Sequence, residues 1–175
     1  MRKLCLVIVL VACICGGEAL AAEPIGEWLV ANGDARIKIE PCPNGLWGVI
    51  SWTREPGVDV KNPDPAKRER PMVGVPILRA MKPVSPDKWE GEVYNAQNGK
   101  MYSANIALVS DDVLKIQGCV LGGIFCGGEN WTRVVPAVQP APAPPQRPGV
   151  RPAAPTAAQQ KAAAAAAEAA CASYQ

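Results

Sequence analysis

Between residues 23 and 135 the sequence is divided into short apolar segments that are bounded by Gly, Pro, Asn and Asp. In the clearest of them, 35–40, apolar and charged residues alternate, which is the period-two pattern of a strand with one buried face. The dipeptide Asn98-Gly99 favours a tight hairpin between two later segments. These patterns predict antiparallel strands over 26–30, 35–40, 46–53, 72–81, 89–94, 102–108, 113–120 and 130–135.

Eight short strands joined mostly by tight turns predict an all-β domain. We expect a closed meander barrel, because closure removes the exposed edges of a sheet. A sandwich of two sheets is the alternative that the strand count allows. The 18 Pro and 16 Gly residues disfavour a helical bundle. A barrel of this size has room for its own side chains or for one small ligand.

Two residues near the ends of this region predict how the barrel closes. Trp28 follows Gly26 on the first strand, and Arg133 lies on the last strand, which is its neighbour in a closed barrel. A guanidinium on an indole face forms a favourable cation–π contact. The pair resembles the lipocalin and calycin signature, in which a first-strand Gly-x-Trp meets a last-strand Arg at the closed end of the barrel. We therefore assign Trp28 and Arg133 to barrel closure, a structural role.

Residues 1–22 have the pattern of an export signal. A positively charged start is followed by an uncharged apolar run and then by small residues, which favours cleavage after Ala21 or Ala22. The run is too short to span a membrane, and no later segment qualifies. We therefore expect a periplasmic or secreted protein without a transmembrane segment. The alternative is a lipoprotein box ending at Cys13, whose acylation would tether the protein to a membrane.

Four of the seven cysteines remain after this cleavage, which in an exported chain indicates disulfide bonds. The spacing favours a bridge between Cys119 and Cys126 around a short Gly-rich loop. Cys42 is an alternative partner for either of them, and Cys171 lies in a tail that we expect to be mobile. The chain has no His and no Cys-x-x-Cys pair, so we expect no metal site.

The composition changes at residue 136. Eight of the 20 residues in 136–155 are Pro, which predicts an extended spacer, and the Ala-rich run 157–172 favours a frayed helix that is marginal by itself. We therefore divide the chain into a signal peptide (1–22), a barrel domain (23–135) and a disordered, Pro/Ala-rich low-complexity tail (136–175). The tail is interpreted either as a spacer in the cell envelope or as low-complexity sequence without a role.

The long loop after the third predicted strand is the strongest candidate for a binding site, with three interpretations. Asp59, Asn62 and Asp64 offer oxygen ligands for Ca²⁺, but their spacing is not that of an EF-hand loop. The same side chains are typical of Asx turns, with Arg68 and Arg70 paired to the carboxylates, and we favour this interpretation. In the third, the loop lies at the barrel mouth, where Arg68 and Arg70 bind a ligand carboxylate or phosphate.

Spaced motifs occur in order over 25–135: Gly26-x-Trp28, Cys42, Gly48-Val49-Ile50-x-Trp52, Asp59-x-Lys61-Asn62-Pro63-Asp64-Pro65, Arg68-x-Arg70-Pro71-x-x-Gly74, Trp89, Gly91-x-Val93-Tyr94, Gly99-Lys100-x-Tyr102 and Trp131-Thr132-Arg133. This set of motifs resembles one exported bacterial family, catalogued as domain of unknown function 2147. The resemblance implies a lipocalin-like fold and a periplasmic role that involves small molecules of the envelope. It implies no catalytic residues, because no reaction is established for the family. Trp47 stands where members often have a second Cys, which disfavours a short bridge from Cys42.

Composition removes several classes of function. Without His there is no Ser-His or Cys-His nucleophile pair, and a net charge of +2 gives no field that would attract nucleic acid. Glu90 and Glu92 lie on one face of a strand, as a carboxylate-based hydrolase requires, but a solvated face explains them better. Trp47, Trp52 and Trp89 suit either barrel packing or a pocket lining.

We therefore expect a non-enzymatic binder of a small hydrophobic or amphipathic envelope molecule, with no cofactor and no nucleic-acid partner. The alternative is a structural or interaction protein of the cell envelope, with a solid core and contacts made through the tail. The sequence gives neither the identity of a ligand nor the oligomeric state.

Overall fold

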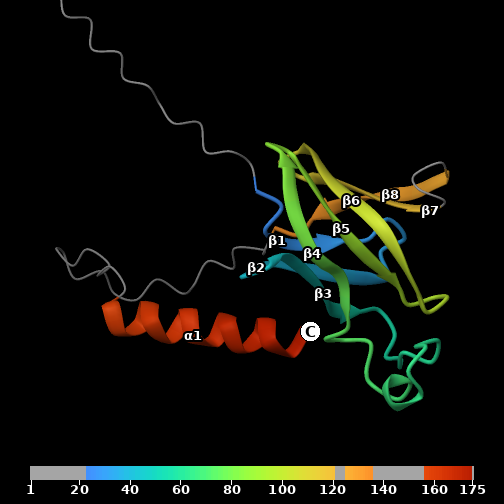
Figure 1. Cartoon of the computed structure of the whole chain (residues 1–175), viewed down its shortest axis with the longest axis horizontal. Coiled ribbons are helices and arrows are strands. Elements are labelled where there is room, and N and C mark those ends of the chain that lie inside the picture. The colour runs from blue at the N-terminus through green and yellow to red at the C-terminus, as the bar shows by residue number, and fades with distance from the viewer. Residues whose placement is uncertain (1–22, 121–124, 136–155, 175) are drawn as a thin grey trace, which may run out of the picture.

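The computed structural model describes residues 23–120, 125–135 and 156–174. Its strands form a closed antiparallel barrel in which each strand pairs with its neighbours in sequence (Figure 1). The predicted barrel is therefore confirmed, and the sandwich alternative is excluded. The strands are β1 (Gly26–Leu29), β2 (Ala35–Cys42), β3 (Gly45–Thr53), β4 (Pro76–Ser85), β5 (Lys88–Asn95), β6 (Lys100–Ser110), β7 (Val113–Val120) and β8 (Phe125–Arg133).

The barrel closes where β1 pairs with β8, and Trp28 lies directly opposite Arg133 in this register. The Arg133 guanidinium carbon is 4.2 Å from the centroid of the Trp28 ring, and Trp28 is fully buried. Arg133 also donates hydrogen bonds to the backbone carbonyls of Glu23 (3.0 Å) and Ile25 (2.8 Å). One side chain thus covers the indole and fastens the segment before β1, which closes this end of the barrel.

Apolar side chains on the inner face of the wall fill the half of the barrel next to this closed end. Trp89 belongs to this core, whereas Trp52 lies on the outer face, is 39% exposed and contacts the guanidinium of Arg36. The packing interpretation therefore applies to Trp89 but not to Trp52. The fully buried apolar side chains include Trp28, Ile39, Leu78, Met81, Ile106 and Leu114.

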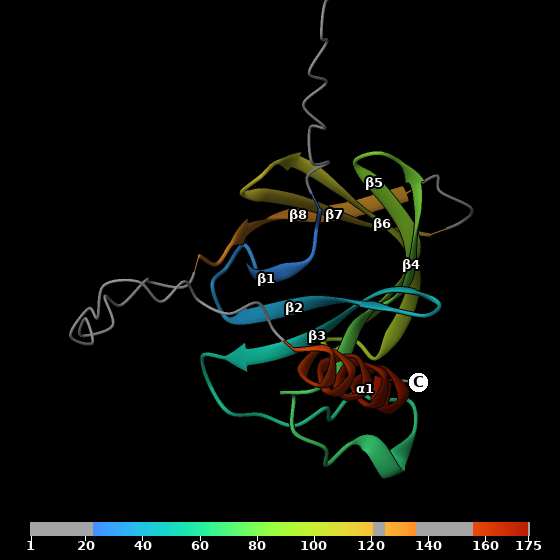
Figure 2. The ribbon, with the colours of Figure 1, turned by 90° about the vertical axis from the view of Figure 1, so that its left-hand side faces the viewer.

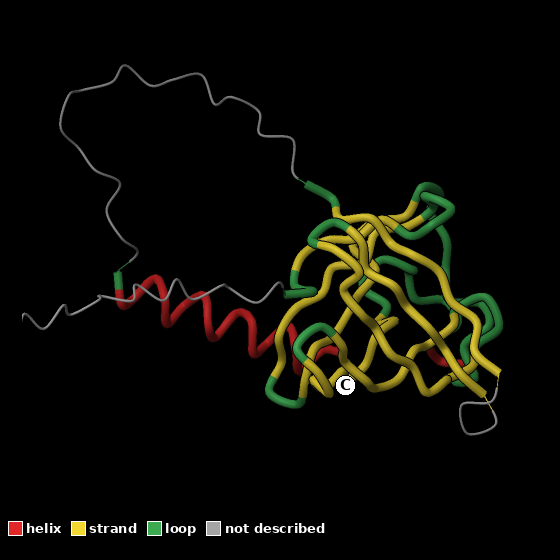
Figure 3. The backbone as a smooth tube through the Cα atoms, turned by 90° about the horizontal axis from the view of Figure 1, so that it is seen from above, coloured by secondary structure: helices red, strands yellow, loops and turns green. Residues whose placement is uncertain are grey.

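Helix α1 (Ala157–Tyr174) lies outside the barrel, beside β2 and β3 (Figure 2), and extends away from the wall (Figure 3). A disulfide bond joins Cys171 near its end to Cys42 at the end of β2. Tyr174 donates a hydrogen bond to Glu40 and stacks on Trp47, with ring centroids 6.2 Å apart. Trp47 is therefore buried beneath the helix rather than in the core.

The expectation of a mobile Cys171 in a disordered tail is wrong for residues 157–174. The helix is held because its last turn contributes a covalent bond and an aromatic ring to the outer wall, two contacts that its own Ala-rich sequence does not reveal. The proposed spacer 136–155, the predicted signal peptide and the acylation alternative at Cys13 lie outside the described residues. None of the described helices combines the length and apolarity needed to cross a membrane.

Candidate ligand-binding pocket

A cavity of about 980 Å³ occupies the half of the barrel opposite the closed end. Its rim includes Asn32 from the β1–β2 turn, Gln97 from the β5–β6 turn and Val120 at the end of β7. These connections all lie at one end of the barrel because neighbouring strands are antiparallel. The volume falls in the range of small-molecule binding pockets, which is roughly 300–1,000 Å³.

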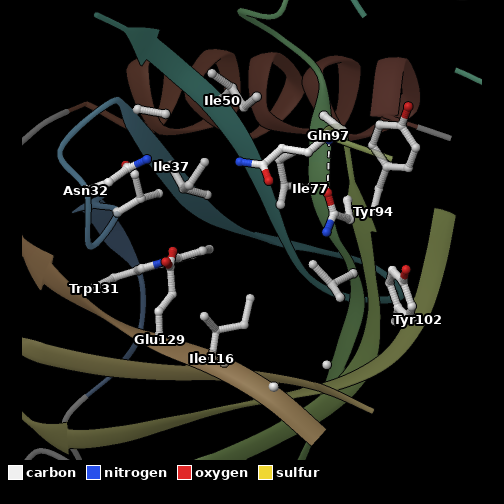
Figure 4. Close-up of a pocket in the computed structure, with 18 of the residues that line it drawn as sticks. Asn32, Ile37, Ile50, Ile77, Tyr94, Gln97, Tyr102, Ile116, Glu129 and Trp131 are labelled. Carbon is white, nitrogen blue, oxygen red and sulfur yellow. Dashed lines mark hydrogen bonds between the residues drawn. The ribbon is translucent and has the colours of Figure 1, made fainter. Parts of the chain in front are cut away.

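Apolar side chains form the walls and floor of the cavity (Figure 4). Space is available partly because Gly127 on β8 faces the cavity, where an added Cβ atom would meet nothing within 4 Å. The missing side chain at Gly127 leaves space empty, whereas large side chains fill the interior at the closed end. The apolar lining includes Ile37, Ile50, Ile77, Val93, Ile116 and Trp131.

Polar side chains also contribute to the lining, and the charged ones among them are acidic. Glu129 on β8 accepts a hydrogen bond of 2.6 Å from the indole N–H of Trp131. Asp34 lies at the rim, where an exposed Arg54 is 3.4 Å from its carboxylate. Among the described residues, no Lys or Arg lines the cavity.

The strand β8 was only partly predicted, and this is why the sequence did not suggest Glu129. The predicted strand begins at residue 130, whereas β8 begins at Phe125 and includes Gly127 and Gly128. Glycines are depleted in strands, so Gly127 and Gly128 did not indicate that β8 begins before residue 130. The signal that remains is the period of two, which places residues 127, 129 and 131 on the cavity side.

The loop between β3 and β4 lies at the open end but is organised around its own buried carboxylate. Asp59 is fully buried, and its side chain accepts hydrogen bonds from the Tyr94 hydroxyl (2.7 Å), the Asn62 amide (2.8 Å) and the Arg70 guanidinium (2.8 Å). The loop also packs tightly on the β5–β6 turn. A Cβ atom at Gly99, whose φ is +71°, would lie 1.8 Å from the carbonyl oxygen of Lys61.

The other polar side chains of the loop bond to its backbone. Asp64 accepts from the backbone N–H of Ala66 and caps a short 3-10 helix, η1 (Pro65–Lys67). Arg68 donates to the carbonyl of Asn62 at 2.8 Å. This geometry matches the turn interpretation, except that Arg68 bonds to a backbone carbonyl and is not paired with a carboxylate. It gives no support to anion binding by Arg68 and Arg70, since both guanidinium groups are engaged within the loop.

None of the five loop residues singled out from the sequence lines the cavity. Their nearest link to it is Tyr94, which is part of the cavity lining and holds Asp59. Among the described residues, no group of three or more His, Cys, Asp or Glu side chains is placed to hold a metal ion.

Electrostatics explain why this buried carboxylate is tolerated. Burial alone would raise the pKa of Asp59, but the hydrogen bonds from Asn62, Tyr94 and Arg70 favour the ionised form and lower the pKa overall. Burial, together with the Asp59 carboxylate, raises the pKa of Tyr94 to about 12. Tyr94 is therefore a permanent hydrogen-bond donor at neutral pH, and it fastens the loop to β5.

A disulfide bond between Cys119 and Cys126 joins β7 to β8 at the open end, as their spacing favours. The two residues lie opposite each other in the strand register. Cys42 bonds to Cys171 instead of to either of them, so the alternative pairings of Cys42 are wrong. The bridge and the packed loop together hold the rim of the cavity.

A closed eight-stranded barrel with an apolar cavity open at one end has the fold of the lipocalin-like β-barrels. Among solved structures it is similar to protein HP1028 from Helicobacter pylori, which is described as belonging to the lipocalin family. The TM-score is 0.60 at 19% identity, over 66% of this chain and 85% of that one, so the likeness concerns the fold alone.

A family model described as an uncharacterized protein conserved in bacteria, domain of unknown function 2147, matches residues 26–133. The chain belongs to this family, and the match covers the barrel from β1 to the end of β8. No curated protein matches the chain.

Proposed function

We propose that this protein binds a small hydrophobic or amphipathic molecule in the barrel cavity, outside the cytoplasm, and does not catalyse a reaction on it. The observation that carries the proposal is the cavity of about 980 Å³, which has apolar walls and an opening at one end. Apolar burial supplies the affinity of such sites, while a few polar groups orient the ligand.

Two further observations support parts of the proposal. Disulfide bonds at both ends of the barrel suit an oxidising compartment such as the periplasm. Glu90 and Glu92, which a carboxylate-based hydrolase would use, are exposed on the outer face of β5, and Glu90 is paired with Lys88. The alternative of a structural protein with a solid core is not favoured, because a cavity of about 980 Å³ lies within the barrel.

The proposal is tested with N-phenylnaphthylamine, a neutral apolar fluorophore whose emission rises in an apolar site. We expect saturable binding to the purified, oxidised protein. Gly127→Leu should weaken it at least about tenfold, because the new side chain takes up cavity volume. Ser103→Leu adds the same side chain to the exposed outer face of β6 and should leave binding unchanged. Absence of saturable binding, or equal binding by both variants and the wild type, would contradict the proposal.

A further inference from the structure

Glu129 is the one carboxylate that projects from the β8 wall between the apolar side chains of the cavity. Figure 4 shows it beside Trp131 and Ile116, and the register pairs it with Ile116 across the β7–β8 ladder. Its Oε1 atom accepts the indole N–H of Trp131 at 2.6 Å. Among the described residues, no cation is paired with this carboxylate, and Oε2 has no hydrogen-bond donor.

The cations near the open end are committed elsewhere or face solvent. Arg70 is held by Asp59, and Arg54 by Asp34 and the carbonyl of Gly33. Lys61 and Lys100 are exposed and do not belong to the cavity lining. The charge that a ligand meets inside the cavity is therefore negative.

This charge distribution discriminates between amphipathic ligands. An anionic headgroup would lie close to the like charge of Glu129, which is unfavourable. An ammonium group supplies both the opposite charge and N–H donors, and charge-assisted hydrogen bonds are about twice as strong as neutral ones. A neutral hydroxyl group supplies a hydrogen-bond donor without the charge, so its affinity should lie between those of the ammonium group and the anionic headgroup.

We propose that the cavity selects a cationic amphiphile, an apolar chain that carries an amino group, and that Glu129 is the counter-ion of this amine. The apolar chain of the ligand lies against the isoleucine side chains of the wall, and its ammonium group donates a hydrogen bond to Oε2 of Glu129. This inference rests on the proposed function, because it names the class of ligand for the same cavity.

The test compares dodecylamine, dodecanol and dodecanoate, which share one alkyl chain, as competitors of N-phenylnaphthylamine at neutral pH. The amine is protonated there, as its pKa is close to the roughly 10.4 of a lysine side chain. We expect dodecylamine to bind at least about tenfold more tightly than dodecanoate, the effect of one charge-assisted contact, with dodecanol between them.

Glu129→Gln keeps the acceptor for Trp131 and should abolish this preference, while Glu129→Lys should reverse it in favour of dodecanoate. Near-ultraviolet circular dichroism verifies that both variants fold. Glu92→Gln removes an exposed carboxylate from the outer wall and should retain the full preference for the amine. The probes are kept below their micellar concentrations.

The outcomes separate the two proposals. If the fluorophore and dodecanol bind, but dodecanoate binds as tightly as dodecylamine or more tightly, the ligand class is wrong and the proposed binding function stands. If the amine preference survives Glu129→Gln, the assignment of Glu129 is wrong. If neither the fluorophore nor any of the three chains binds, the proposed function fails and this inference fails with it.

Discussion

The two ends of this barrel are built from the same strands and differ in what their inward side chains do. At the closed end, large apolar side chains fill the interior, and Arg133 covers Trp28. At the open end, Gly127 and Glu129 leave a cavity with a negative charge in its wall. Strand β8 serves both ends, because every second residue along it faces inward. A single strand can therefore combine a structural seal with a binding surface.

Truncating the same residue type at each end should give the largest difference between the two ends. Ile106 is fully buried in the core near the closed end, whereas Ile77 is half-buried and lines the cavity. Ile106→Ala should lower the free energy of unfolding by about 2–5 kcal/mol, because it leaves a void among tightly packed neighbours. Ile77→Ala should cost only about 1 kcal/mol, since the site already borders open space.

Urea unfolding followed by tryptophan fluorescence measures both isoleucine variants. Equal losses of stability would mean that the open end is packed as tightly as the closed end, and the cavity would then not exist in solution. The fluorophore offers an independent control, because Ile106→Ala should leave its binding site intact.

The next largest effect concerns the loop at the open end. Asp59→Asn should lower the free energy of unfolding by about 2 kcal/mol at neutral pH, because the charge that holds Arg70, Asn62 and Tyr94 is lost. The folded-state pKa of Asp59 is lowered relative to its unfolded value of about 3.9. Its contribution is therefore fully present above the unfolded pKa and is lost as the pH falls through the folded pKa.

Urea midpoints from neutral to acidic pH test this sign. The stability gap between the wild type and Asp59→Asn should be constant above about pH 5 and should shrink as the medium becomes more acidic. Glu55→Gln, which changes an exposed carboxylate in the same loop, should follow the wild type throughout. A gap that widened on acidification would show that the network does not stabilise the ionised form of Asp59.

The last comparison concerns the two disulfide bonds. Removing the short bridge with Cys119→Ser and Cys126→Ser should cost about 2–3 kcal/mol by the loop-entropy relation. Cys171→Ser should cost the barrel only about 1 kcal/mol although its bridge spans 129 residues, because releasing α1 frees the folded state as well as the unfolded one.

Limited proteolysis complements the unfolding curves for Cys171→Ser. Cleavage within residues 157–174 should become faster while the barrel remains intact, since an isolated helix of this length is marginal in water. If the variant lost the stability of about 4–5 kcal/mol that the loop-entropy relation predicts for the long segment between Cys42 and Cys171, the helix would be an integral part of the barrel fold. Unchanged cleavage would show that Tyr174 and its contacts hold α1 without the bridge.

Much of the fold could be predicted, because strand patterns and turns are local. The alternation in 35–40 and the Asn98-Gly99 turn correctly indicated β2 and the β5–β6 hairpin. The candidate site could not be predicted in the same way. Asp59 and Arg70 are residue types typical of a binding loop, yet they pair with each other. Glu129 was missed because the first half of its strand contains two glycines.

From the sequence alone we could predict an eight-stranded barrel, its closure through Trp28 and Arg133, and, as the favoured pairing, the short bridge between Cys119 and Cys126. Each of these depends on residues that are close in the chain or that the ends of a meander bring together. The folded structure was needed to show that Cys171 bonds to Cys42, that Asp59 pairs with Arg70 within the loop, and that Glu129 faces a cavity. These depend on how side chains from distant strands share the interior, and the volume left over is a property of the whole packing.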